Sequence, residues 1–305
     1  MAMSDPPAPV RHVLHVGFPK TGSKFLQTWF AAHPEIGFSP WGFGGFADTH
    51  QLVTEAARGV PEPLVRVTSH EALLAPFPDL ANLGAGAGPL LPTRQAQKQA
   101  CRLVAGLFAA ARIVIVTRGF GTLLPSLYAE MVLGGATFSF DDFCAALYRQ
   151  AERGEDMLQL PEAIADYEAR FGVSNVLALP YELLRDQPEA FLRALSEFLG
   201  VEAFASTSAI VHPSPPAVLL PAYRRLTGIV QALPTPARAR EALTRRYISA
   251  MRIGKLERLA ALLVRRGGAS PEPVVPEPLV RLLKQRCAPL SARPAFRRFE
   301  QDYFA

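Results

Sequence analysis

The sequence predicts an α/β protein with a central parallel sheet flanked by helices, because short apolar runs alternate with longer segments of helical period. Strands are expected over 12–17, 64–68, 112–117 and 175–179. Helices are expected over 22–32, 93–110, 121–133, 140–152, 161–171 and 188–199. Strands that alternate with helices in this way are typical of a parallel sheet covered on both faces.

After Gly200 the pattern changes. A proline-rich joint covers 211–218. Segments of helical period follow at 219–231, 235–264 and 276–286. Pro234 separates the first two segments, and a Gly- and Pro-rich loop over 267–278 separates the last two. No further strand is predicted there. We therefore expect a disordered N-terminal segment (1–11), a core with the binding motifs (12–205) and a helical C-terminal extension (206–305) on the same domain.

Charge is divided unevenly along the 305 residues, which carry a net charge of +5. Residues 1–205 hold 15 basic and 21 acidic side chains, whereas residues 206–305 hold 17 basic and 6 acidic ones. The basic C-terminal third favours an anionic partner, such as an acidic glycan or a membrane surface, or else an Arg-rich solvated face. Nucleic acid is not expected, because no helix-turn-helix, zinc-finger or RNA-binding motif is recognisable.

Cysteine usage and the N-terminus point to a cytoplasmic protein. The three cysteines, Cys101, Cys144 and Cys287, are widely spaced and match neither a disulfide framework nor a metal site. The first ten residues lack an apolar stretch of the secretory type, and no segment approaches the roughly 20 apolar residues of a membrane span. We expect no metal.

The segment after the first predicted strand predicts an anion site. Residues 17–24 read GFPKTGSK, so a loop with two glycines leads from a buried strand to the start of a helix. The first N–H groups of a helix have no partner within it and the helix dipole is positive there, so an anion binds. Lys20, Ser23 and Lys24 supply charge and a hydroxyl.

This loop differs from the nucleotide-binding P-loop, in which Lys directly follows the second glycine and precedes Ser or Thr. Here Ser23 and Lys24 are exchanged, and Lys20 lies inside the loop. Two later strands are followed by Arg118 and Pro180 rather than by an Asp that would hold magnesium. An ATP-dependent kinase with a degenerate P-loop and a non-catalytic nucleotide-binding module stay as alternatives.

Three blocks resemble the sulfotransferases that use 3'-phosphoadenosine 5'-phosphosulfate (PAPS). The first, GFPKTGSKFLQTWFAAHPEI, is similar to the family's 5'-phosphosulfate loop through Pro19, Lys20, Thr21, Gly22 and Ser23, with Lys24 where a small hydroxyl residue is usual. The second, RIVIVTRGFGTLLPSLY, is similar to the family's 3'-phosphate segment, with Arg118 and Ser126 at the matching spacing. The third places Tyr181 where an adenine or cofactor contact is expected.

The resemblance spans residues 12–201 and implies a P-loop NTPase-like sulfotransferase fold with PAPS as co-substrate and no metal. It implies transfer of a sulfuryl group to a hydroxyl of a glycan or of a glycosylated or lipid-linked metabolite, with Lys20 stabilising the leaving phosphate. Acceptor selection falls to the loops 39–50 and 84–93 and to the basic C-terminal region, whose sequences do not name the acceptor.

Two adjacent residues at the end of the second predicted strand compete as the base. His70 has a pKa near neutrality without any tuning, whereas the pKa of Glu71 must be raised by burial. The resemblance allows either residue, and we favour Glu71 because Ser69 and Glu71 match the Ser-x-Glu element of many bacterial and glycan-directed members. We expect structural roles for the other histidines: His12, His15, His33, His50 and His212.

Overall fold

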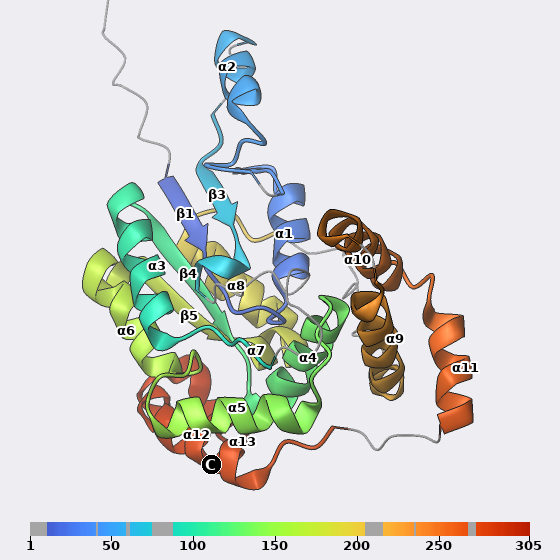
Figure 1. The fold of residues 1–305 in the computed structure, drawn as a ribbon. Coiled ribbons are helices and arrows are strands. Elements are labelled where there is room, and N and C mark those ends of the chain that lie inside the picture. The colour runs from blue at the N-terminus through green and yellow to red at the C-terminus, as the bar shows by residue number, and fades with distance from the viewer. Residues whose placement is uncertain are drawn as a thin grey trace, which may run out of the picture.

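A computed structural model describes residues 11–40, 42–58, 62–74, 88–204, 216–234, 236–267 and 273–305. A five-stranded parallel sheet lies at its centre with helices on both faces (Figure 1). The strand order is β2-β3-β1-β4-β5. The bounds are β1 Arg11–His15, β2 Ile36–Phe38, β3 Val65–Ser69, β4 Arg112–Thr117 and β5 Val176–Pro180.

The two central strands are apolar on both faces. In β1, Val13 pairs with Val67 of β3 and with Arg112 of β4. Val13 and Leu14 are fully buried, as are the four residues 113–116 of β4. Such double burial explains why these strands are continuous apolar runs instead of alternating patterns.

Helices close both faces of the sheet. On one face, α1 (Ser23–Ala32) and α8 (Pro188–Leu199) supply Trp29, Phe30, Phe191 and Leu195 to an apolar cluster with β1, β3 and β4. On the other face lie α3 (Arg94–Leu107), α4 (Phe120–Leu133), α5 (Phe140–Glu152) and α6 (Leu160–Phe171). The short helices η1 (Glu71–Leu73), η3 (Val173–Asn175) and α7 (Tyr181–Asp186) flank strand ends, and α2 (Thr49–Arg58) has no buried residue.

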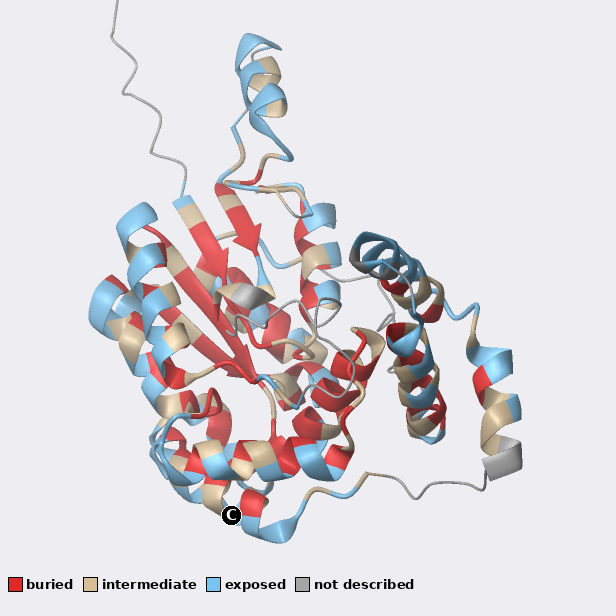
Figure 2. Ribbon diagram, viewed as in Figure 1, coloured by how far each residue is buried: buried red, intermediate tan, exposed pale blue. Residues whose placement is uncertain are grey.

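The C-terminal third is helical in its described part. Its elements are η4 (Ala217–Leu219), α9 (Leu220–Ala232), α10 (Ala237–Arg252), α11 (Glu257–Gly267), α12 (Glu277–Cys287), η5 (Ala288–Ala292), η6 (Pro294–Phe299) and α13 (Glu300–Tyr303). Phe296 and Tyr303 are fully buried in the same apolar cluster as α4, α5 and α6. Figure 2 shows that the buried residues of the protein concentrate on the strands and on the helices packed against them. No helix in the described ranges has both the length and the apolar character needed to cross a membrane.

The structure confirms the parallel sheet with its flanking helices and corrects several details. β2 and α2 were not expected, and the helix expected over 235–264 is two helices separated at Ile253–Leu256, where Gly254 has a φ of 76°. Arg11, assigned to the disordered segment, begins β1, while residues 1–10 lie outside the described residues. So do most of the proline-rich joint (211–215) and residues 268–272 of the later loop.

Candidate functional site

The predicted site residues come together at the carboxyl ends of the strands. All five strands are parallel, so the residues that follow β1, β3, β4 and β5 meet at one edge of the sheet. β2 and β3 lie on one side of β1, and β4 and β5 lie on the other. The direction in which the chain adds strands to the sheet therefore reverses at β1. Ligands of open α/β sheets bind at such a point.

The loop after β1 is held rigidly beside β4. The N–H groups of Val16 and Phe18 donate to carbonyls of β4 at 2.9 and 3.4 Å, and the Phe18 ring is buried in the core. The Thr21 hydroxyl closes the turn by donating to the Phe18 carbonyl at 2.6 Å. Pro19 is half-buried in the same turn. The backbone of this loop is therefore pre-formed.

Two left-handed residues shape the loop. Lys20 has a φ of 67° and is the only non-glycine residue with a positive φ among those that the structure describes. Gly22, which caps α1, has a φ of 85°, and a Cβ there would lie 2.9 Å from Leu184 and 3.3 Å from the Tyr181 ring. A non-glycine residue held in this region stores strain of about 1–3 kcal/mol, a property common at ligand sites.

Arg118 joins the loop to the ends of β4 and β5. Its Nη1 donates to the Lys20 carbonyl at 2.8 Å, and its Nε donates to Thr122 Oγ1 at 3.0 Å. The guanidinium lies 4.7 Å from the centre of the Tyr181 ring. Ser126 is buried farther along α4 and makes its own contact within the protein. The predicted 5' and 3' contact residues are thus linked directly.

The acidic candidate, Glu71, lies beside the loop. Burial raises the pKa of its carboxyl above the usual range, and Glu130 adds to this effect, while Ser23, Lys20 and Lys24 oppose it. Ser23 is buried, and its hydroxyl has no hydrogen bond of normal geometry among the described residues, although it is close enough to Glu71 to lower the pKa of that carboxyl. Lys24 is exposed.

His70 is placed differently from Glu71. Its side chain is exposed, and its backbone N–H donates to the His15 carbonyl at 3.0 Å. His15 is fully buried and bonded through Nδ1 to the Ser69 hydroxyl at 2.8 Å, and burial lowers its pKa to about 4. His15 is therefore neutral at neutral pH, and a structural role for it remains our expectation.

A family model described as "Sulfotransferase family" matches residues 13–206. This chain belongs to that family. A search of curated proteins found no match. Among solved structures, a sulfotransferase from Alicyclobacillus acidocaldarius is 17% identical with a TM-score of 0.41, covering 80% of this chain and 100% of its own. Mouse sulfotransferase SULT7A1 complexed with PAP is 17% identical with a TM-score of 0.36, covering 65% of this chain and 61% of its own.

The structure adds a carboxylate to the site of this sulfotransferase that the sequence analysis did not single out. Glu130 of α4 forms an ion pair with Lys20 at 3.7 Å and a second one with Arg252, the last residue of α10, at 3.0 Å. The sequence could have indicated Glu130, because it follows the predicted phosphate ligand Ser126 by one helical turn and so lies on the same face of α4. No local signal pointed to Arg252, which is 122 positions farther along the chain.

A buried network behind Arg118 was also missed. Glu182 is fully buried, and its carboxylate accepts from the Gly119 N–H at 2.9 Å and from the Tyr303 hydroxyl at 2.8 Å. The same hydroxyl lies 3.0 Å from Thr117 Oγ1. The C-terminal residues of the chain therefore hold the turn that carries Arg118. Glu182 directly follows Tyr181 of the third sequence block, but nothing near Tyr303 in the sequence marks Tyr303 as its partner.

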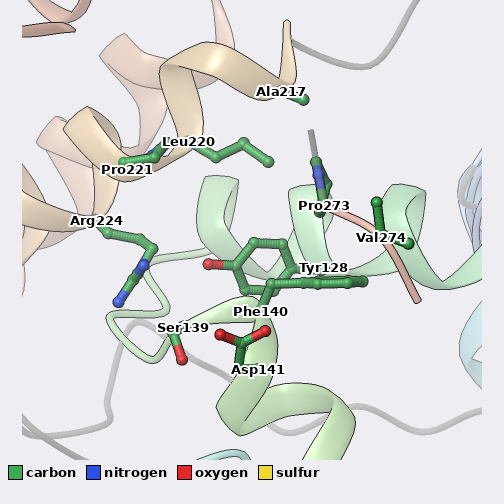
Figure 3. A pocket seen from close by; sticks show the side chains of 10 residues that line it. All are labelled: Tyr128, Ser139, Phe140, Asp141, Ala217, Leu220, Pro221, Arg224, Pro273 and Val274. Atoms are coloured by element: carbon green, nitrogen blue, oxygen red, sulfur yellow. The ribbon is translucent and has the colours of Figure 1, made fainter. Parts of the chain in front are cut away.

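A separate pocket lies on another face of α4 (Figure 3). It has a volume of about 370 Å³ and is lined by Tyr128 and Phe140 together with Leu220 of α9. Tyr128 is two residues from both Ser126 and Glu130, so it leaves the helix in a different direction. The pocket's charged groups, Asp141 and Arg224, have opposite signs, so it has no net preference for an anion. The described residues contain no cluster of three or more side chains suited to a metal ion.

We expect Tyr303→Phe to lower the free energy of unfolding by about 1–3 kcal/mol, because the buried Glu182 carboxylate then loses a donor while the ring still fills its space. Denaturant titration followed by circular dichroism measures the change. Tyr148→Phe, at a half-exposed hydroxyl in α5, is the matched control and should shift the value by less than about 0.5 kcal/mol. Equal shifts in the two variants would show that the network contributes nothing.

Proposed function

We propose that this protein transfers a sulfuryl group from PAPS to a hydroxyl of a glycan or of a glycosylated or lipid-linked metabolite. The observation that carries the proposal is the hydrogen bond from Arg118 to the Lys20 carbonyl, which joins two anion-binding elements into one site. One element is the start of α1 with its lysines, and the other is the start of α4 with Arg118 and Ser126. A donor with phosphate groups at its 5' and 3' positions fits both.

The residues present support this donor. The first turns of α1 and α4 contain no acidic side chain and neither helix has a side-chain cap, so apart from the Gly119 N–H, which donates to Glu182, their N–H groups are available to anions. Ser23 offers a buried hydroxyl with no well-formed bond in this structure. Tyr181 presents its ring between Gly22 and Arg118 and is suited to contact the nucleoside. Pro19, Thr21 and Gly22 form the backbone of the cradle.

When bound, the donor supplies a sulfuryl group attached to a phosphate leaving group. The roles of Lys20 and Glu71 follow from this chemistry. Lys20 faces the charge that develops on the leaving oxygen as the bond from sulfur to that oxygen breaks. Glu71 accepts the proton of the acceptor hydroxyl as the new bond to sulfur forms. Lys20 and Glu71 interact electrostatically, so both groups act within one small space.

The end of the basic helix α10 lies beside Lys20, because Arg252 pairs with Glu130 at 3.0 Å and Glu130 pairs with Lys20. This arrangement supports our expectation that the C-terminal region takes part in acceptor selection, and it agrees with contact to an anionic surface. The loop 39–50 is described except for Trp41, and of the loop 84–93 the residues 88–93 are described.

The first test is a calorimetric titration without magnesium. Adenosine 3',5'-bisphosphate should bind more tightly than AMP by about 2–4 kcal/mol, a factor of about 30 to 1000, because only the bisphosphate bonds to both Arg118 and Ser126. Arg118→Ala should remove most of this difference, whereas Arg153→Ala, at an exposed arginine in an ion pair, should not. Equal affinity of the wild type for both ligands would contradict the proposal.

Lys20→Ala should lower kcat by a factor of about 100 to 1000 and weaken bisphosphate binding much less, because the ammonium acts chiefly as charge builds on the leaving oxygen. Single-turnover rates and calorimetry separate the two effects. Lys24→Ala, at the exposed lysine of the same loop, should lower kcat less than Lys20→Ala does. If Lys20→Ala reduced binding and rate by the same factor, Lys20 would be a ground-state phosphate ligand and Lys24 the better catalytic cation.

Glu71 should govern the acidic limb of the pH–rate profile. A base must be deprotonated, so the rate rises with pH through the pKa of Glu71, which burial places above the usual carboxyl range. Glu71→Gln should abolish this limb and lower the rate by a factor of about 100 to 10,000. His70→Asn should preserve the limb, and its loss in that variant instead would identify His70 as the base.

A further inference from the structure

The helices α10 and α11 combine strong positive charge with exposed apolar side chains. Residues 237–267 contain nine Arg or Lys and only two Glu. Arg245 is 62% exposed even though it pairs with Glu241 on the same helix. Charge of this density attracts a polyanion or an anionic surface over about a Debye length, which is about 8 Å at physiological ionic strength.

The apolar side chains narrow the choice of partner. In α11, Leu259 and Leu262 are 46% and 56% exposed and lie one turn apart on one face, next to the exposed Arg258. Ile253, at the end of α10, is 63% exposed. Phosphodiesters and sulfated glycans offer little apolar area to such residues, whereas a bilayer offers both anionic headgroups and acyl chains. This combination favours a lipid surface over nucleic acid.

The position of these helices links the surface to the reaction. α10 packs against α9 and contacts α4, and its last residue, Arg252, is ion-paired with Glu130. Glu130 in turn pairs with Lys20 at 3.7 Å. Ile253 follows Arg252 directly. The apolar and basic residues therefore begin beside the proposed transfer site and continue along α11. Figure 1 shows α11 on the far side of α9 from the sheet.

From these observations, we infer that the exposed faces of α10 and α11 dock on an anionic lipid bilayer and that the acceptor hydroxyl belongs to a lipid-linked molecule in that bilayer. The docking residues are Arg245, Arg246, Ile253, Leu259 and Leu262. The arginines supply long-range attraction to the headgroups, and the three apolar side chains enter the interfacial region. The part of this inference that names the acceptor rests on the proposed sulfuryl transfer, whereas the docking itself does not.

Co-sedimentation with vesicles tests the docking. The full chain should bind vesicles of phosphatidylcholine mixed with phosphatidylglycerol, bind phosphatidylcholine vesicles weakly, and release the mixed vesicles as salt rises. The double variant Leu259→Ser with Leu262→Ser should lose affinity for the mixed vesicles by about tenfold or more, because two apolar side chains no longer enter the bilayer. The double variant Arg245→Glu with Arg246→Glu should lose at least as much.

The matched control is Leu103→Ser with Leu107→Ser, which removes two leucines of α3 that are 67% and 73% exposed and outside the proposed surface. Its affinity for the mixed vesicles should equal that of the wild type. Equal losses in the two leucine variants, no binding of the wild type to mixed vesicles, or binding to a DNA duplex but not to vesicles would overturn the docking.

Bisphosphate titrations of the same preparations separate this inference from the proposed function. Each surface variant should bind adenosine 3',5'-bisphosphate as the wild type does, which also shows that it is folded. A protein that binds bisphosphate but not vesicles refutes the docking and leaves the proposed function intact. A protein that binds vesicles but does not distinguish bisphosphate from AMP refutes the proposed function and leaves the docking intact.

Discussion

The site depends on one hydrogen bond, from the Arg118 guanidinium to the Lys20 carbonyl. It fixes a lysine in a left-handed backbone conformation that few non-glycine residues adopt, and it sets the relative position of the loops that follow two neighbouring strands. The Tyr181 ring beside Arg118 and the buried Glu182 behind Gly119 extend the same constraint to β5 and to the end of the chain. Because these contacts form within the protein itself, the geometry of the proposed anion site exists without a bound anion.

The main features of the fold could be predicted because their causes are local. The apolar runs of β1 and β4 signal double burial, and Gly17 and Gly22 mark the strand-to-helix loop. The three-residue strand β2 is too short to have a detectable pattern, and it forms because Ile36 pairs beside Val65. The expected long helix over 235–264 has a continuous helical period, but Gly254 in the left-handed region ends its first half.

The site could be predicted only in part, because several of its contacts join distant parts of the chain. β3 ends at Ser69 and Glu71 begins the short helix η1, so the alternation of side chains along a strand does not say which of His70 and Glu71 faces the loop. Exposure distinguishes them, since Glu71 is half-buried and His70 is exposed. The pairing of Tyr303 with Glu182 joins positions 121 residues apart, so no spacing rule could reveal it.

Under the proposed function, the carboxylate shared between Lys20 and Arg252 couples donor binding thermodynamically to the position of α10. Glu130 neutralises part of both cations, so an anion that engages Lys20 changes the strength with which Glu130 holds Arg252. Such coupling is reciprocal: whatever draws Arg252 away from Glu130 alters the affinity of Lys20 for its anion by the same free energy. Through Glu130, anion binding at Lys20 would thus change the position of the last turn of α10, about 230 residues later in the chain.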